Sequence, residues 1–206
     1  MTGRFITLEG GEGSGKSTQA ALLRDSLAAD GRRVLLLREP GGEPVAEAVR
    51  EVVLHAAAPV TDRTELLLFL AARAQLVERV IRPALADGTV VVCDRYGDST
   101  VAYQGYGRGR DVDAARDLNA YATGGLAPDL TVLLDIAPEV GLARQGDRNR
   151  MEREPLDFHR RVRVGYLAEA RRDAARFAVI DASTSVDGVH SRVLDAVRTR
   201  VLCAMP

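Results

Sequence analysis

A glycine-rich segment near the start of the chain constrains the fold more than any other feature. It begins at Gly10, directly after an apolar run at residues 5–8, and matches the pattern G-x-x-x-x-G-K-[ST]. The segment and the residue after it are Gly10, Gly11, Glu12, Gly13, Ser14, Gly15, Lys16, Ser17 and Thr18. An apolar strand before the pattern and a helical pattern after it, over residues 16–29, are the context of a phosphate-binding loop. The segment predicts an α/β fold that holds the phosphates of ATP.

Each part of this loop has a chemical reason. Glycines allow backbone conformations that are closed to other residues, and they bring N–H groups close to phosphate oxygens. The helix that follows directs its positive N-terminus at the same anion. We expect Lys16 to reach the β- and γ-phosphates and the Ser17 hydroxyl to bind the Mg²⁺ that accompanies ATP.

Five short apolar runs, separated by helical patterns, predict a five-stranded parallel sheet with helices on both faces. The runs are residues 4–8, 34–37, 89–93, 130–134 and 177–180. Each run is followed by a charged residue, in order Glu9, Arg38, Asp94, Asp135 and Asp181. Ligands of open α/β sheets bind beyond the carboxyl ends of the strands, so these side chains outline a site.

Composition limits the alternatives. The 206 residues are 46% hydrophobic with a formal net charge of −1, so no basic field indicates a nucleic acid or an anionic membrane as partner. The longest apolar block, residues 66–72, is far shorter than the roughly 20 residues that span a bilayer. Cys93 and Cys203 show neither metal-ligand spacing nor a disulfide framework, which is typical of a reducing cytosol. We expect one cytoplasmic domain over residues 1–206, without a signal peptide.

The longest helical pattern covers residues 62–87. We expect Asp62 to cap its start, with Glu65 completing the capping box three residues later. Phe69 and Arg73 lie four residues apart and therefore share one helix face. By helix pattern alone, Phe69 is typical of a core aromatic.

A second group of polar residues follows the third predicted strand. Asp94 lies where a carboxylate could hold Mg²⁺ through water, and Arg95 offers a planar fork that suits phosphate. By itself, this dipeptide is more typical of a local ion pair. If the next segment is helical, two pairs share neighbouring faces: Ser99 with Tyr103, and Thr100 with Gln104. An aromatic ring among hydrogen-bonding groups suits a nucleoside.

Several motifs together resemble those of the thymidylate kinase family, in its bacterial form, over nearly the whole chain. They are FITLEG at residues 5–10, REPGG at 38–42, LFLAARAQL at 68–76, DRY at 94–96 and AYQ at 102–104. The resemblance implies a P-loop NTPase fold that transfers the γ-phosphoryl group of ATP to dTMP. The products are dTDP and ADP, in dTTP biosynthesis, with Mg²⁺ as cofactor and a homodimer as the assembly.

The resemblance also implies roles at the acceptor base and sugar. Phe69 stacks on the thymine ring, and Arg73 donates a hydrogen bond to a ring carbonyl. Gln104, helped by Thr100, reads the pyrimidine edge. Tyr103 crowds the sugar so that a 2′-hydroxyl is disfavoured.

Other residues are implied to contact phosphate and the remaining groups. Arg95, with Arg38, binds the acceptor monophosphate, and Ser99 belongs to the same acceptor site. Glu12 contacts the 3′-hydroxyl or a magnesium-bound water. Residues 181–183 resemble the loop on the adenine side of the family's ATP site.

An arginine-rich segment at residues 144–155 resembles the family's mobile lid. Some family members carry an arginine in the phosphate loop, whereas position 13 here is glycine, so we expect the lid to supply the cation. Arg150 and Arg153 are the candidates for stabilising the transferring phosphoryl group, an effect of roughly 10³-fold or more. As a pattern alone, a solvated charged helix explains the segment equally well. We expect Arg150→Ala to reduce turnover far more than monophosphate binding, and Arg108 is more typical of an exposed turn.

The implied nucleophile is a phosphate oxygen, which is already mostly ionised at neutral pH because the second pKa of a phosphate monoester is near 6. No general base is then needed, and Lys16, Mg²⁺, Arg95 and the lid act by position and charge. A GTPase would need an Asn-Lys-x-Asp stretch, which the sequence lacks. A kinase acting on a hydroxyl would need a base, such as Glu39 or Asp94. A regulator without activity would not need an intact Lys16 and Arg95.

Overall fold

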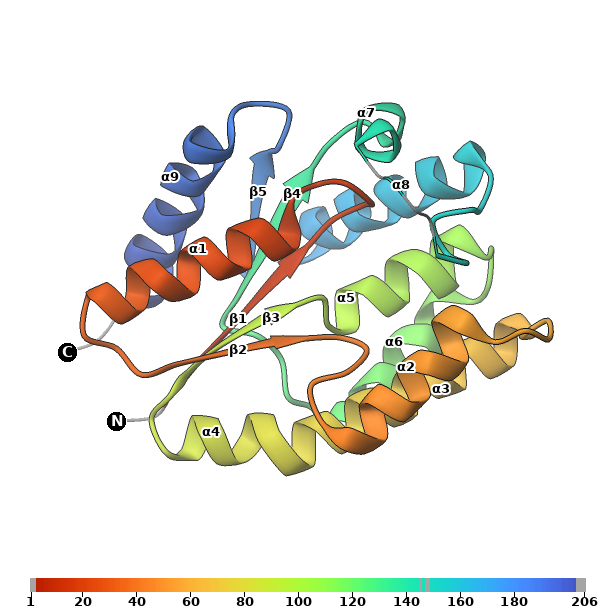
Figure 1. Cartoon of the computed structure of the whole chain (residues 1–206), viewed down its shortest axis with the longest axis horizontal. Helices are drawn as coiled ribbons and strands as arrows, with labels where there is room; N and C mark the ends of the chain where they lie inside the picture. Colours follow the sequence, from red (N-terminus) through yellow and green to blue (C-terminus); the bar gives the residue numbers. More distant parts are fainter. Residues whose placement is uncertain (1–2, 145, 147–148, 203–206) are drawn as a thin grey trace.

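The computed structural model of the chain describes residues 3–144, 146 and 149–202, and a five-stranded sheet forms its centre (Figure 1). The strands are β1 (Arg4–Glu9), β2 (Val34–Arg38), β3 (Val90–Asp94), β4 (Leu130–Asp135) and β5 (Phe177–Asp181). They are all parallel, in the order β2-β3-β1-β4-β5. The predicted fold class is confirmed, and each strand ends on the charged residue that was expected to follow it. Because the strands are parallel, these five side chains lie along one edge of the sheet.

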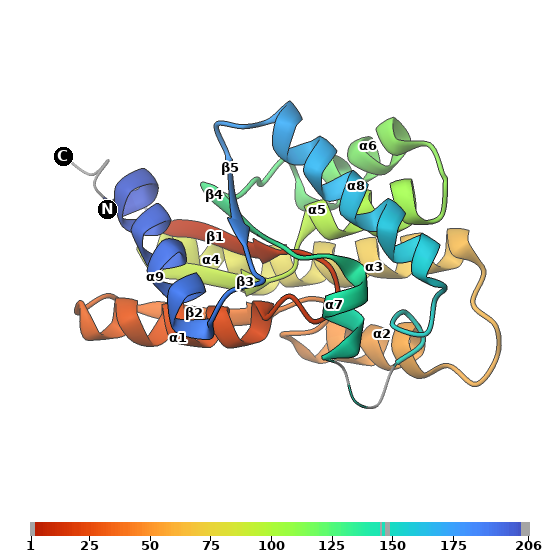
Figure 2. The same ribbon diagram turned by 90° about the horizontal axis from the view of Figure 1, so that it is seen from above.

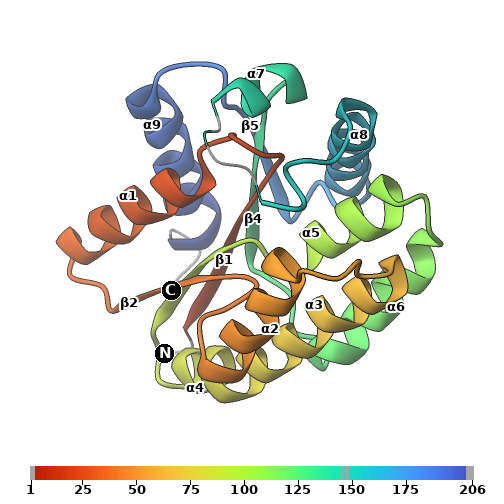
Figure 3. The same ribbon diagram turned by 45° about the vertical axis from the view of Figure 1, so that its right-hand side comes forward.

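Helices cover both faces of the sheet (Figure 3). Two of them, α1 (Lys16–Ala29) and α9 (Val186–Val197), pack on one face. The others are α2 (Pro44–His55), α3 (Asp62–Leu76), α4 (Arg82–Ala86), α5 (Gly97–Thr100), α6 (Val112–Thr123), α7 (Pro138–Ala143) and α8 (Leu156–Arg172). Three π-helical segments continue α3, α5 and α9: Val77–Ile81, Val101–Gly107 and Arg198–Leu202. No helix in the described part of the chain is both long and apolar enough to cross a membrane.

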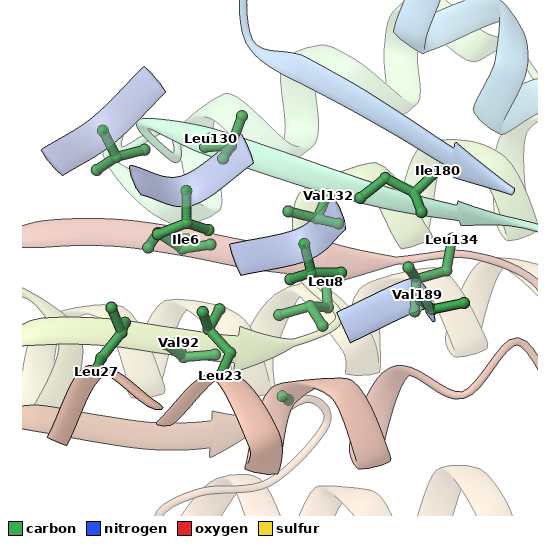
Figure 4. Close-up of a cluster of buried hydrophobic side chains, with 14 of the residues drawn as sticks. Ile6, Leu8, Leu23, Leu27, Val92, Leu130, Val132, Leu134, Ile180 and Val189 are labelled. Carbon is green, nitrogen blue, oxygen red and sulfur yellow. The ribbon is translucent and has the colours of Figure 1, made fainter. Parts of the chain in front are cut away.

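The alternation of side chains along each strand divides the core into two layers. Ile6 and Leu8 pack towards α1 and α9, where Leu23 and Val189 meet them (Figure 4). Phe5 points to the opposite face and packs with the helix that continues α3. Both faces of β1 are therefore buried from solvent, which explains why its sequence is a continuous apolar run.

The long helical pattern is confirmed, but its predicted cap is wrong by one residue. Helical structure runs from Asp62 to Ala86, with a π-helical turn in the middle. Thr61 is the N-cap, and its Oγ1 accepts a hydrogen bond from the backbone N–H of Thr64. Glu65 does not close a capping box, because its carboxylate is buried and bound by arginines from other segments.

Candidate functional site

A cavity of about 480 Å³ lies at the edge where the strands end. Most of the site residues predicted from the sequence line it. They are Glu12, Gly13, Gly15, Lys16, Ser17, Thr18, Arg38, Phe69, Arg73, Asp94, Arg95, Ser99, Thr100, Tyr103 and Gln104. Segments that are far apart in the sequence therefore meet around one space, large enough for a small ligand.

The phosphate loop joins β1 to α1 through backbone conformations that glycine adopts readily. Gly13 and Gly15 have φ angles of 65° and 87°, and Gly15 is the N-cap of α1. Lys16 is buried, and its Nζ donates to the backbone oxygen of Gly11 at 2.8 Å. Burial, followed by the charge of Arg95, lowers the pKa of Lys16 to about 8. An anion in the loop would offset this repulsion between cations.

The loop between β1 and α1 passes beside α7, the short helix after β4 (Figure 2). Within this loop, Gly13 lies against Gly141 of α7. A Cβ at position 13 would lie 1.9 Å from the carbonyl oxygen of Gly141. A Cβ at position 141 would lie 2.1 Å from the carbonyl oxygen of Glu12. Contacts this short are sterically forbidden, so the loop excludes a side chain at position 13 unless α7 moves. Packing thus explains why this loop carries no arginine.

Ser17 and Asp94 bring two oxygen atoms together beside the loop. The Ser17 hydroxyl donates to Asp94 Oδ2 at 2.5 Å. Hydroxyl and carboxylate oxygens suit Mg²⁺, which usually takes few protein ligands and completes its shell with phosphate and water. The two side chains therefore fit a magnesium ion that is shared with nucleotide phosphates.

Arg95 lines the cavity and has a left-handed backbone conformation, with a φ of 72°. Non-glycine residues adopt this conformation rarely, and it is commonest at functional sites. Its Nη2 donates to Glu12 Oε1 at 2.8 Å and to Tyr103 Oη at 3.1 Å. Its Nη1 lies 3.3 Å from both Ser99 Oγ and Tyr166 Oη. These contacts hold the planar fork beside the phosphate loop.

The carboxylate of Glu12 keeps its charge in this buried place. Burial raises the pKa of Glu12, but the charges of Arg95 and Lys16 outweigh burial and bring the pKa to about 2. The acidic group is therefore ionised at neutral pH and partly neutralises the cations around it.

Two further arginines, Arg38 and Arg50, line the cavity near Arg95. Arg38 was predicted from the sequence, whereas Arg50 on α2 was not, because nothing in the local pattern distinguishes it from a solvated helix residue. Burial, and then the charge of Arg38, lowers the pKa of Arg50. Three guanidinium groups therefore lie near one another in the cavity wall, where Glu47 pairs with Arg38 and Glu12 pairs with Arg95.

Arg73 lies on α3, at another part of the cavity wall, and is almost fully buried. All five of its N–H groups have partners within the protein. Nε and Nη2 contact Glu39 Oε2, Nη2 also donates to Tyr96 O, and Nη1 donates to Thr100 Oγ1 and Asn119 Oδ1. A bond from Arg73 to a ring carbonyl would have to replace or share one of these contacts. Glu39 is ion-paired with Arg73, so it is not a free base for a hydroxyl kinase.

Two arginines of the lid, Arg150 and Arg153, lie outside the cavity wall in this conformation. Arg150 Nη2 lies 2.6 Å from Glu65 Oε2, and its Nε donates to Val53 O at 3.0 Å. Arg153 is exposed, and neither arginine lines the cavity. In this conformation the buried carboxylate of Glu65 holds Arg150 away from the phosphate loop, and a role of Arg150 and Arg153 beside the transferring phosphoryl group stays a prediction.

A different lid arginine reaches the phosphate loop. Arg144 lines the cavity, and its Nη1 lies 3.3 Å from the carbonyl oxygens of Gly13 and Ala182. It thus bridges the loop after β1 and the loop after β5. Three other lid residues, Gln145, Asp147 and Arg148, lie outside the described residues.

Behind Arg95 lies a buried polar cluster in which Glu9 and Ser99 were expected near the site and Tyr166 was not. Glu9 Oε2 accepts hydrogen bonds from Ser99 Oγ at 2.6 Å and from Tyr166 Oη at 3.0 Å. Burial, and then the charge of Asp98, raises the pKa of Glu9 to about 7. Tyr166 comes from α8, the helix after the lid, and only the folded chain reveals its contact with Arg95.

A parallel sheet with a glycine-rich phosphate loop after β1, a buried lysine and a cationic cavity defines a P-loop nucleoside triphosphate-binding protein. Comparisons with known proteins identify the family within this class. The family model described as Thymidylate kinase matches residues 8–193. The chain belongs to the thymidylate kinase family.

Individual relatives agree with this membership. A thymidylate kinase from Synechococcus sp. (strain JA-3-3Ab) is 52% identical over 202 residues, which cover 98% of each chain. One from Deinococcus radiodurans is 50% identical, over 96% of this chain and 98% of the relative. The crystal structure of thymidylate kinase from Ehrlichia chaffeensis is similar with a TM-score of 0.81 and 34% identity, covering 96% of this chain and 100% of that one.

Proposed function

We propose that the chain is a thymidylate kinase that transfers the γ-phosphoryl group of ATP to dTMP, giving dTDP and ADP for dTTP biosynthesis. One observation carries this proposal: a single cavity joins a phosphate loop, a group of three arginines and a partly aromatic wall. The loop suits the donor, the arginines suit a second phosphate, and the wall suits a base. The whole chain, residues 1–206, acts as one catalytic domain.

The donor phosphates occupy the loop, where Lys16 and the N-terminus of α1 meet them. Ser17 and Asp94 would hold Mg²⁺, which would supply positive charge to offset that of the nucleotide phosphates. Arg144 lies between this loop and residues 181–183 and contacts the donor from that side. In this proposal Arg144 stabilises the transferring phosphoryl group, the role that the sequence suggested for Arg150 and Arg153.

The acceptor monophosphate binds among Arg95, Arg38 and Arg50. Glu12 and Tyr103 hold the fork of Arg95 beside the loop, and Arg95 binds the anion by sharing or exchanging some of these contacts. The attacking oxygen is already ionised at neutral pH, so no side chain has to remove a proton. Catalysis rests on holding two phosphates in line while cations offset their repulsion.

The thymine ring binds at the wall formed by α3 and by the segment after β3. Phe69 is half-buried and lines the cavity, where its ring is available for stacking. Thr100 and Gln104 line the same wall and read the polar edge of the ring. Tyr103, held by its hydroxyl to Glu12, crowds the sugar on the side of a 2′-hydroxyl. A hydrogen bond from Arg73 to the ring requires an exchange of one of its present partners.

We also propose a homodimer. Apolar side chains are exposed on three helices that lie side by side, α2, α3 and α6 (Figures 1 and 3). Val52, Leu67 and Tyr121 are 48%, 52% and 89% exposed. A two-fold contact through these helices would cover such residues. Analytical ultracentrifugation tests this, and a purely monomeric chain at micromolar concentration would contradict it.

The decisive experiment for the function is a coupled assay of ADP release with ATP, Mg²⁺ and a panel of nucleoside monophosphates. Fastest turnover is expected with dTMP, with dUMP behind it, because the 5-methyl group contributes only about 1–3 kcal/mol. Thymidine itself should be inert, which separates this activity from a hydroxyl kinase. Lys16→Met is the control for background hydrolysis. Absence of dTDP formation by the purified wild-type chain would sink the proposal.

A further inference from the structure

The residue that carries a further inference is Glu65, on the first turn of α3. Its carboxylate is fully buried, yet it holds three partners from two segments, the π-helical segment after α5 and the lid. Gln104 Nε2 donates to Oε1 at 3.1 Å, Arg108 Nη2 donates to Oε2 at 3.1 Å, and Arg150 Nη2 donates to Oε2 at 2.6 Å. Burial raises the pKa of Glu65, but hydrogen bonds from Arg108, Gln104 and Arg150 outweigh burial and lower it below the usual value. The group is an ionised carboxylate, which can only accept hydrogen bonds.

This restriction fixes the direction of the Gln104 amide. The NH₂ group of Gln104 must face Glu65, because turning the amide would place its carbonyl oxygen against a buried carboxylate. Gln104 lines the cavity, so the carbonyl oxygen Oε1 is the atom that remains for a ligand. An oxygen acceptor at this place matches a ring N–H and repels a ring nitrogen that has a lone pair.

The neighbouring Thr100 cannot supply the same discrimination. Its Oγ1 accepts from Arg73 Nη1 at 2.8 Å, which leaves one hydroxyl hydrogen and one lone pair. The hydroxyl can therefore serve either a carbonyl or an amino group of a base. The amide of Gln104, held by Glu65, has no such freedom.

We propose that Glu65 is a positioning residue that sets base selectivity: by orienting Gln104, it makes the site accept pyrimidines with N3–H, thymine and uracil, and reject cytosine, whose N3 is an acceptor. The inference rests on the proposed function and adds the residue that determines selectivity at the ring edge.

Glu65→Gln tests the proposal. In this variant the new carbonyl oxygen takes the place of Oε2 and faces Nη2 of both arginines, and the new NH₂ group takes the place of Oε1 and faces Gln104. Arg108 Nε, which also donates to Oε1 in the wild type, then exchanges Glu65 for Asp62. Gln104 turns and presents its own NH₂ group to the cavity. The ratio of kcat/KM for dTMP over dCMP should fall about tenfold to a hundredfold, the range of one polar base contact. Glu78→Gln is the matched control, because Glu78 lies on the π-helical continuation of α3 but pairs with Arg82 at the surface, away from Glu65. The control should leave the ratio unchanged.

A purely structural role for Glu65 would lower kcat/KM for both substrates alike and leave the ratio intact. That result with a folded variant would overturn the inference. A double-mutant cycle adds a second criterion: Glu65→Gln should have no further effect on the ratio in a Gln104→Leu background, since it acts through Gln104. An equal effect in both backgrounds would also overturn it.

The wild-type protein provides a test that does not depend on the stability of any variant. In a crystal structure with dTMP, Gln104 should still contact Glu65 while it faces N3 of the ring. Departure of Gln104 from Glu65 in that complex would overturn the inference. A wild-type chain without dTMP kinase activity would instead refute the proposed function, so the two failures are distinguishable.

Discussion

The contact between Gly13 and Gly141 gives the sharpest quantitative prediction, because it combines a backbone constraint with a packing constraint. Gly13 has a φ of 65°, and a residue with a Cβ costs roughly 1–2 kcal/mol in this left-handed conformation. The Cβ would lie 1.9 Å from the Gly141 carbonyl oxygen, so α7 must move by roughly 1.5 Å to restore a van der Waals contact of 3.4 Å. Overpacking of this kind costs about 1–3 kcal/mol. Gly13→Ala should therefore lower the free energy of unfolding by about 2–5 kcal/mol.

Two matched variants separate the contributions. Gly31 has a φ of 78° and open space where a Cβ would lie, so Gly31→Ala carries only the backbone cost of roughly 1–2 kcal/mol. Gly141→Ala carries only the overlap, with Glu12 O at 2.1 Å. Gly141→Ala should also disturb the loop and reduce kcat/KM for ATP by about 10²-fold, whereas Gly31→Ala should leave it unchanged.

Urea unfolding and steady-state kinetics on the three variants make the measurement. The reasoning is refuted if Gly13→Ala loses no more stability than Gly31→Ala and Gly141→Ala keeps the wild-type kcat/KM for ATP. That outcome would mean that α7 yields freely and that packing does not explain the glycine at position 13.

Three other predictions concern charge at the site. The pKa of Glu9 is raised from 4.5 to about 7, so the native state binds the proton of this carboxyl more tightly than the unfolded state does. The free energy of unfolding should therefore fall as pH rises from about 4.5 to 7, by at most about 3 kcal/mol. Glu9→Gln should flatten this slope in urea unfolding between pH 5 and 8, and an unchanged slope would contradict the assignment. Arg95→Lys keeps the charge but loses the planar fork, so kcat/KM for dTMP should fall at least about 10²-fold, and a value near wild type would rule out a role for the fork. Arg144→Ala should lower turnover at saturating substrates at least about tenfold, whereas Arg153→Ala should not, and the reverse order would restore the sequence-based assignment.

The strands and the phosphate loop were predictable because their signals are local. An apolar run, a charged residue at its end and a glycine-rich loop are each read within ten residues, and parallel order then brings the strand ends to one edge. The family resemblance supplied roles for residues such as Gln104, which helix spacing alone left undecided.

The residues whose surroundings were not predicted from the sequence depend on contacts between distant segments. Glu65 looked like part of a capping box, since Glu three residues after a capping residue is the usual local pattern. Its actual role depends on Arg108 and Arg150, which lie 43 and 85 residues away in the sequence. Arg108, expected in an exposed turn, is largely buried against this carboxylate. No local pattern reports that a carboxylate is buried, so no local pattern could place these arginines.

The charges of the cavity are arranged for the bound state rather than the free one. Lys16 is the clearest example, because burial and the charge of Arg95 bring its pKa down to about 8. Arg50 is opposed by Arg38 and Arg95 in the same way. Each repulsion is one that a phosphate placed between the cations would remove. The attraction between these cations and the two anionic substrates therefore offsets the repulsion between the substrates as they approach each other. Because the attacking oxygen is already ionised, transfer then needs no base.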